Sequence, residues 1–223
     1  MNKKVFVIIP AFNEEKNLGD VLREVKKYTE NIVVVNDGSK DCTGEIGREA
    51  GTITIDHFLN RGLGAALGTG IEAALLLGAR YIITFDADGQ HKAEDILRLV
   101  KTAEEGYDVV IGSRLINPDG MPWTRRFANW IGNIVTYFLF GIWVTDSQSG
   151  LRLFSKEAAK SLNLKSNRME VSSEIIKEIK RNNLKFKEIP IEAIYTDYSL
   201  SKGQGFIVGL KTLFNLILQK FNR

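Results

Sequence analysis

The stretch TFDADGQH, residues 84–91, decides how this sequence is to be interpreted. An apolar run typical of a buried strand, residues 81–85, ends in Asp86 and Asp88, and Gln90 follows at the same spacing. Side chains two residues apart in an extended segment point the same way, so these three can converge on one point. Carboxylate and amide oxygens suit a hard divalent cation such as Mg²⁺ or Mn²⁺. The stretch therefore predicts a metal site at the end of a strand.

A plain turn is the alternative interpretation of the same stretch. Asp-Gly is a common loop dipeptide, and Asp88 could cap a helix that follows it. Residues 86–91 do not form an EF-hand loop, because the glycine is at the fourth position instead of the sixth. Local spacing leaves the metal site and the turn both open.

Strand-like and helix-like segments alternate on both sides of this stretch. Further strands are predicted over residues 5–9, 32–35, 52–55 and 109–111, and helices over residues 14–27, 40–50, 62–78 and 94–104. Strands this apolar, separated by amphipathic helices, predict an α/β fold with a mostly parallel sheet covered on both faces. Ligands bind such sheets beyond the carboxyl ends of the strands. That edge should carry residues 10–15, Asp37, residues 86–90 and residues 112–114.

The second half of the sequence is less regular. Residues 189–191 resemble a short strand and residues 205–221 an apolar helix, while the helix at 62–78 should use its glycines at close contacts. No linker or repeat separates the two halves, so we expect one domain over residues 1–223. Residues 127–145 carry no charge over nearly the length of a membrane span, but polar residues and glycines interrupt them. A buried or interfacial helix is the better expectation there.

Composition excludes several classes of protein. Hydrophobic residues make up 44% and charged residues 26%, which is ordinary for a soluble globular protein. The formal net charge of +3 is too small to argue for nucleic acid as a partner. The single cysteine, Cys42, permits no intrachain disulfide and fits a reducing compartment. The first apolar run is too short for a secretory signal, so a cytoplasmic location is expected.

The loops after the first two strands lack the usual dinucleotide-binding signature. Residues 10–15 stand where a dinucleotide-binding protein would place G-x-G-x-x-G, and Gly62, Gly64 and Gly68 have the wrong spacing. Asn13 could simply be the N-cap of the next helix. Asp37 follows the second strand, where nucleotide-binding α/β proteins often place an acid, although Asn-Asp-Gly also makes a turn.

Five motifs in order make the sequence resemble the family 2 glycosyltransferases of the GT-A fold, in particular the dolichyl-phosphate mannose synthase type. These motifs are Pro10-Ala11-Phe12-Asn13-Glu14-Glu15, Asn36-Asp37-Gly38-Ser39, Asp86-Ala87-Asp88-Gly89-Gln90-His91, Gly112-Ser113-Arg114 and Asp146-Ser147-Gln148-Ser149-Gly150-Leu151-Arg152. They cover roughly residues 5–155, and weaker similarity continues to about Lys202. The motifs are specific for the family but not for the sugar.

The resemblance implies a role for each donor-side residue. The residues that would hold the nucleotide sugar are Pro10, Ala11, Asn13, Glu14, Asp37, Asp86, Ala87 and Asp88. Asp86, Asp88 and Gln90 would bind Mg²⁺ or Mn²⁺, itself bound to the donor's diphosphate. Lys202 resembles a lysine that reaches the same diphosphate. His57 and His91 are expected to be structural.

The resemblance also implies an acceptor site. Arg114 would bind the phosphate of the acceptor lipid together with Arg125 or Arg126, and Ser149 is a further candidate. The serine that the subgroup has four residues beyond its second arginine is replaced by Asn129, counting from Arg125. Members that glycosylate hydroxyls use a carboxylate in the region of Asp146 as a base. A lipid phosphate is already ionised, so for this acceptor Asp146 would mainly shape the pocket.

The implied protein is an inverting, metal-dependent glycosyltransferase, with Asp88, Arg114 and Asp146 as catalytic residues. It would move mannose or glucose from GDP-mannose or UDP-glucose to polyprenyl or dolichyl phosphate, attached peripherally to the cytoplasmic face of a membrane. Residues 1–115 would bind the nucleotide sugar, and residues 116–223 the acceptor and the membrane surface. Two alternatives stay open. The first is transfer to a hydroxyl of a saccharide or soluble acceptor, and the second is a nucleotide-binding module without turnover.

Overall fold

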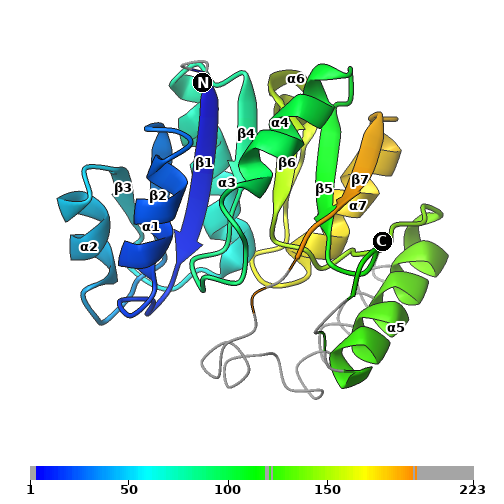
Figure 1. The fold of residues 1–223 in the computed structure, drawn as a ribbon, viewed down its shortest axis with the longest axis horizontal. Coiled ribbons are helices and arrows are strands. Elements are labelled where there is room, and N and C mark those ends of the chain that lie inside the picture. The colour runs from blue at the N-terminus through cyan, green and yellow to red at the C-terminus, as the bar shows by residue number, and fades with distance from the viewer. Residues whose placement is uncertain (1–3, 119–120, 122, 193, 195–223) are drawn as a thin grey trace.

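The computed structural model describes residues 4–118, 121, 123–192 and 194 (Figure 1). The strands of this part are β1 Val5–Ala11, β2 Ile32–Asn36, β3 Ile53–Asp56, β4 Tyr81–Thr84, β5 Val109–Ser113, β6 Arg152–Ser155 and β7 Phe186–Pro190. The helices are α1 Leu18–Lys26, α2 Thr43–Glu49, α3 Leu63–Leu76, α4 Asp95–Glu104, α5 Trp123–Phe140, α6 Lys156–Ser161 and α7 Val171–Arg181. The expected alternation of strands and helices is confirmed, with element ends displaced by a few residues.

All seven strands form one sheet in the order β3-β2-β1-β4-β6-β5-β7. Neighbouring strands are parallel except at β6, which is antiparallel to both β4 and β5. Arg152 at the start of β6 pairs with Thr84 near the end of β4 and with Ile111 of β5. The segment before β6 therefore lies at the edge where the parallel strands end. The predicted α/β class with a mostly parallel sheet is confirmed.

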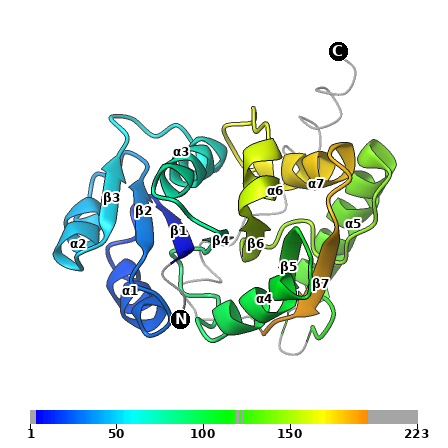
Figure 2. The same cartoon turned by 90° about the horizontal axis from the view of Figure 1, so that it is seen from above.

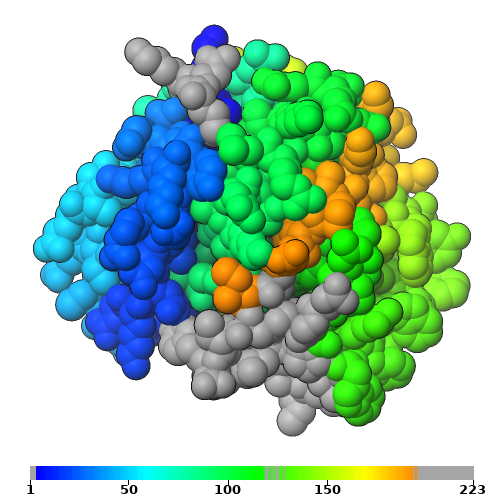
Figure 3. All heavy atoms as spheres, viewed as in Figure 1, coloured from blue at the N-terminus to red at the C-terminus, as the bar shows by residue number. Residues whose placement is uncertain are grey.

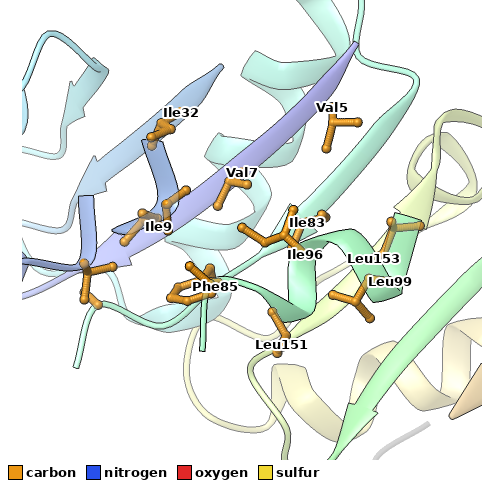
Figure 4. Packing of buried hydrophobic residues seen from close by; sticks show 14 of the residues in the cluster. Val5, Val7, Ile9, Ile32, Ile83, Phe85, Ile96, Leu99, Leu151 and Leu153 are labelled. Atoms are coloured by element: carbon orange, nitrogen blue, oxygen red, sulfur yellow. The ribbon is translucent and has the colours of Figure 1, made fainter. Parts of the chain in front are cut away.

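Helices cover both faces of the sheet, as Figure 2 shows from above, with α1 and α4 on one face and α3, α6 and α7 on the other. The first face is closed by Ile9, Ile83 and Phe85 of the β1 and β4 regions, packed with Ile96 and Leu99 of α4 (Figure 4). A second apolar cluster fills the space under α3, α6 and α7. Because both faces are buried, the central strands are apolar at nearly every position.

Helix α5 packs beside α7 at one end of the molecule (Figures 1 and 3). Asn133 and Thr136 face the protein: the Asn133 side chain donates to the Thr145 carbonyl, and the Thr136 hydroxyl lies 3.5 Å from that of Ser173. Its large aromatic side chains Trp123, Phe127, Trp130 and Phe138 are exposed. Two of the polar interruptions of the uncharged run, Asn133 and Thr136, thus lie on the inward face of the helix. In the described part of the chain, no helix has the length and apolarity to cross a bilayer.

Some elements differ from the sequence-based expectation. Strand β6 and helices α6 and α7 were not predicted, and the strand expected at 189–191 begins earlier, as β7. The helix expected at 205–221 lies outside the described residues. Gly64 and Gly70 of α3 make close contacts, as expected, whereas Gly68 does not: a Cβ at Gly70 would lie 2.3 Å from Cγ2 of Ile8, and one at Gly64 would lie 1.8 Å from the Ser166 carbonyl oxygen.

Two glycines on α3 give a matched stability test. Gly70→Ala should lower the free energy of unfolding by about 1–3 kcal/mol, because the new methyl group overpacks against the buried Ile8. Gly68→Ala should raise it by up to about 1 kcal/mol, because nothing lies within 4 Å of its Cβ position and alanine favours the helix. Urea denaturation measures both values. Equal effects of the same sign would show that α3 does not lie on β1 as described.

Candidate active site

The loops after β1 and β2 are joined to each other. Asn13 has a left-handed φ of 54°. Its backbone N–H donates to the Ser39 hydroxyl at 3.0 Å, and its side-chain oxygen accepts from the Lys40 N–H at 2.9 Å. Helix α1 begins only at Leu18, so Asn13 is not its N-cap. The amide of Asn13 instead joins the two loops that follow Ala11 and Asn36.

Asp37 is buried beneath the loop that follows β3. One carboxylate oxygen lies 2.7 Å from Nδ1 of His57 and accepts from the Arg61 N–H at 2.9 Å, while the other accepts from the Gly62 N–H at 2.7 Å. Nε2 of His57 lies 2.9 Å from the hydroxyl of Thr69. Asp37 and His57 therefore hold residues 57–62 in place. Direct contact between Asp37 and a nucleotide stays a prediction.

The two acidic residues after β4, Asp86 and Asp88, have pKa values that are shifted in opposite directions. Burial and the charge of Asp86 raise the pKa of Asp88 to about 6. Burial also opposes ionisation of Asp86, but the hydrogen bond from His91 and the positive charges near it outweigh burial and lower its pKa. The amide of Gln90 donates to Asp88 at 2.7 Å, and Nε2 of His91 lies 3.1 Å from Asp86. Two crowded carboxylates beside a side-chain amide form a site whose charge a bound cation would relieve.

The donor set fits a divalent cation that shares its ligands with a substrate. Among residues 4–118 and the other described positions, no group of three His, Cys, Asp or Glu side chains could hold a metal. Mg²⁺ and its relatives commonly use one or two carboxylates, with phosphate oxygens and water completing the shell. Asp86 and Asp88 would supply those carboxylates, and the Gln90 amide oxygen would add a third protein ligand.

Gly150 leaves the space in which Asp86 sits. A Cβ at Gly150 would lie 1.9 Å from a carboxylate oxygen of Asp86. The hydroxyl of Thr84 donates to the Gly150 carbonyl at 2.7 Å, which ties this turn to the end of β4. The glycine of the motif at 146–152 therefore determines where one predicted metal ligand can lie.

Arg114 makes a two-pronged ion pair with the fully buried Asp146. Its Nε and Nη2 donate to the two carboxylate oxygens at 2.7 and 2.9 Å, and its backbone N–H donates at 3.1 Å. Burial opposes ionisation of Asp146, but the charge and hydrogen bonds of Arg114 outweigh burial and lower its pKa. A carboxylate held this way is a weak base. Asp146 does more than shape the pocket, because it fixes the guanidinium of Arg114.

Arg152 and Glu188 support this pair and were not predicted. Arg152 is 1% exposed, and its Nη2 donates to the Ser147 carbonyl at 2.8 Å. Burial lowers its pKa to about 10, against the charges of Asp146 and Asp86. Glu188 of β7 accepts from the backbone N–H of Thr145 at 2.8 Å and of Asp146 at 3.2 Å. The place of Arg152 in the motif at 146–152 could have indicated a role in the site. Nothing in the sequence around Glu188 indicated one.

Other predicted site residues differ in exposure, and two of them are not described or only partly described. Ala87, which lies between Asp86 and Asp88 in the sequence, is buried in the apolar core, and Arg126 is exposed on α5. Ser149 is fully buried, and its hydroxyl accepts from the Leu151 N–H at 3.3 Å, so contact with a phosphate would require the turn to move. The side chain of Arg125 and all of Lys202 lie outside the described residues.

An aromatic groove of about 480 Å³ begins next to the ion pair. Its lining includes Leu115, Trp123, Arg126, Phe127, Trp130, Trp143 and Thr145. Leu115 follows Arg114, and Thr145 precedes Asp146, so one end of the groove adjoins both partners of the ion pair. The groove can accept an apolar chain whose polar end lies at Arg114.

The contact between Gly150 and Asp86 predicts a selective loss of metal binding. Gly150→Ala should weaken Mn²⁺ binding about 10- to 100-fold, because the new methyl group displaces the Asp86 carboxylate. Calorimetric titration with Mn²⁺ and nucleoside diphosphate measures this. Gly132→Ala is the control, because nothing lies within 4 Å of that Cβ position. Unchanged affinity in a folded Gly150→Ala protein would remove Asp86 from the metal site.

Similar proteins were found by both sequence and structure. The sequence model of glycosyl transferase family 2 matches residues 6–162. An uncharacterised Methanocaldococcus jannaschii protein is 54% identical, with 97% of this chain and 92% of that protein covered. A UDP-N-acetylglucosamine–dolichyl-phosphate N-acetylglucosaminyltransferase from Methanococcus voltae is 38% identical, with 100% and 98% covered. A polyprenol monophosphomannose synthase from Mycolicibacterium smegmatis is 33% identical, with 73% and 65% covered.

The fold has known counterparts at low sequence identity. Glucosyl-3-phosphoglycerate synthase from Mycobacterium tuberculosis, in complex with Mn²⁺ and UDP-glucose, superposes with a TM-score of 0.73 at 16% identity. The match covers 98% of this chain and 79% of the synthase, and at that identity it shows the fold alone. With the family match over most of the sequence and the full-length similarity to a dolichyl-phosphate sugar transferase, this chain belongs to glycosyltransferase family 2 and has the GT-A fold.

Proposed function

We propose that this glycosyltransferase transfers a sugar from a nucleotide-sugar donor to a polyprenyl phosphate, which is dolichyl phosphate in an archaeal or eukaryotic host. The observation that carries the proposal is the Arg114–Asp146 ion pair at one end of an aromatic groove. A guanidinium suits a phosphate, and the groove suits an isoprenoid chain. The relatives named for dolichyl or polyprenol phosphate acceptors support the same class of acceptor.

The donor would lie over the carboxyl ends of β1, β2 and β4. We assign Pro10, Ala11, Asn13, Glu14 and Asp37 to the nucleotide. Asp86, Asp88 and Gln90 would hold Mg²⁺ or Mn²⁺. When bound, the cation stabilises negative charge on the departing nucleoside diphosphate. The Mn²⁺ and UDP-glucose in the synthase of similar fold support a divalent cation here.

The acceptor phosphate would attack from the side of Arg114. Its oxygen forms a bond to the anomeric carbon as the bond from that carbon to the diphosphate breaks, with inversion. No proton has to leave a phosphate oxygen that is already ionised. A hydroxyl acceptor would need a base, and Asp146 is poorly suited to that role because Arg114 keeps its pKa low. This favours a phosphate over a hydroxyl acceptor.

Helix α5 would bring the site to the membrane surface. Its exposed side chains Trp123, Phe127, Trp130 and Phe138 form an aromatic face, with Arg126 on the same helix. Aromatic and basic residues together suit the headgroup region of a bilayer. We propose that α5 lies in the interface of the cytoplasmic leaflet. About residues 1–115 then serve the donor, with Arg114 as the exception, and about residues 116–223 serve the acceptor and the membrane.

A transfer assay tests the proposed function. With Mn²⁺ and radiolabelled GDP-mannose, UDP-glucose or UDP-N-acetylglucosamine, label should pass to polyprenyl phosphate and not to the matching polyprenol. Asp88→Ala should abolish transfer, and Arg114→Lys should lower kcat/KM for the acceptor about 100-fold or more, because lysine cannot replace a bidentate guanidinium. Arg48→Lys, at an exposed ion pair with Asp56, is the control. Equal transfer to polyprenol or to a sugar hydroxyl would contradict the phosphate acceptor.

A further inference from the structure

The loop between β3 and α3 presents two apolar side chains to solvent at the carboxyl edge of the sheet. In residues 57–61, called here the Phe58 loop, Phe58 is 97% exposed and Leu59 is 67% exposed. We propose that this loop is a second membrane contact, which inserts Phe58 and Leu59 into the bilayer interface on the opposite side of the active site from α5. The proposal rests on the proposed function in that the acceptor is a membrane lipid.

Hydrogen bonds of Asp37 and His57 hold the Phe58 loop in place. The Asp37 carboxylate accepts from the N–H groups of Arg61 and Gly62, and His57 is fixed between Asp37 and Thr69. The backbone N–H of His57 also donates to the Asn36 carbonyl at 2.9 Å. These buried hydrogen bonds thus hold the loop in a conformation that leaves Phe58 and Leu59 exposed to solvent. Because the tip is already ordered, inserting it into an interface would lose little conformational entropy.

The backbone of the tip packs directly on the loop after β2. A Cβ at Gly38 would lie 2.5 Å from the backbone nitrogen of Asn60, and Gly38 has a φ of 73°. Only glycine allows this close approach without strain. The backbone at the tip is therefore packed against the loop after β2, while the Phe58 side chain stays exposed.

The charges around the tip favour a membrane over another apolar partner. Arg61 in the loop is exposed, and Lys165 and Arg168 are exposed on the neighbouring segment. That segment lies against the start of α3, where the Gly64 N–H donates to the Asn167 carbonyl at 2.8 Å. An apolar tip bordered by cations matches an interface with anionic headgroups above and acyl chains below.

The position of the loop suggests how a second membrane contact would orient the protein. Strand β3 is one edge of the sheet and β7 is the other, with α5 beyond it next to α7. Six strand spacings of about 4.8 Å put the two edges roughly 29 Å apart. Asp88 and Arg114, after β4 and β5, lie between the two apolar surfaces. Two separated contacts would fix the tilt of the sheet, so that the site faces the lipid phosphate.

Vesicle partition tests this contact with a matched control. The probe is a phosphatidylcholine vesicle containing phosphatidylglycerol, separated by flotation. Changing Phe58 and Leu59 together to serine should lower the partition coefficient about tenfold or more. The control changes Leu76 and Leu77 to serine, because they are 83% and 50% exposed at the end of α3 away from the site. The control should bind vesicles as the unaltered protein does.

Other roles for the Phe58 loop would give different experimental results. Unchanged partition of the Phe58 and Leu59 variant, or an equal loss in the control, would overturn the proposal. So would a loss of nucleotide-sugar affinity or of a dimer in sedimentation with partition unchanged, because the loop would then serve the donor or a second copy. Transfer to a short, water-soluble polyprenyl phosphate without vesicles should keep its kcat/KM in the variant. If the unaltered protein does not transfer sugar to this soluble acceptor, the proposed function is contradicted. The vesicle partition result would still test the membrane contact by itself.

Discussion

The ion pair between Arg114 and Asp146 is the interaction on which the rest of the site depends. Asp146 is fully buried, and a buried carboxylate is stable only with a charge partner and satisfied hydrogen bonds. Arg114 supplies three of those hydrogen bonds, and Arg152 adds a second positive charge. Removing one partner of such a pair typically costs about 3–5 kcal/mol, because the other is left buried and unpaired. The pair therefore fixes the loop after β5 against the turn before β6.

The antiparallel strand β6 explains why this turn reaches the active site. A parallel strand would place the preceding segment at the opposite edge of the sheet, whereas β6 runs against β4 and β5 and brings residues 146–151 to their carboxyl ends. The same turn then serves both halves of the site. Asp146 holds Arg114, and Gly150 leaves room for Asp86. One short segment thus connects the predicted metal ligands to the predicted phosphate site.

The sequence predicted the parts of the structure that depend on local pattern. Apolar runs gave β1, β2, β4 and β5, since strands buried on both faces must be apolar throughout. Strand β6 was missed because it opens with the charged Arg152, and α7 was missed because Glu174 and Glu178 are polar residues on its buried face. Their carboxylates accept from the backbone N–H groups of Lys165 and Asn163, contacts that no helical periodicity reveals. The resemblance to a family placed Asp86, Arg114 and Asp146 at one edge, but it could not show that two of them pair. The role of Glu188 depends on strand neighbours far apart in the sequence.

We propose that Asp146 acts by holding Arg114 for the acceptor's phosphate, instead of removing a proton. The most direct measurement is the dissociation constant of polyprenyl phosphate, with Mn²⁺ and nucleoside diphosphate present, for the unaltered protein and for Asp146→Asn. The variant must first be shown to unfold cooperatively. If Asp146 positions the guanidinium, the variant should bind the acceptor about tenfold or more weakly, because a neutral amide no longer fixes Arg114. Unchanged acceptor affinity together with a large loss of kcat would contradict the claim and identify Asp146 as a base.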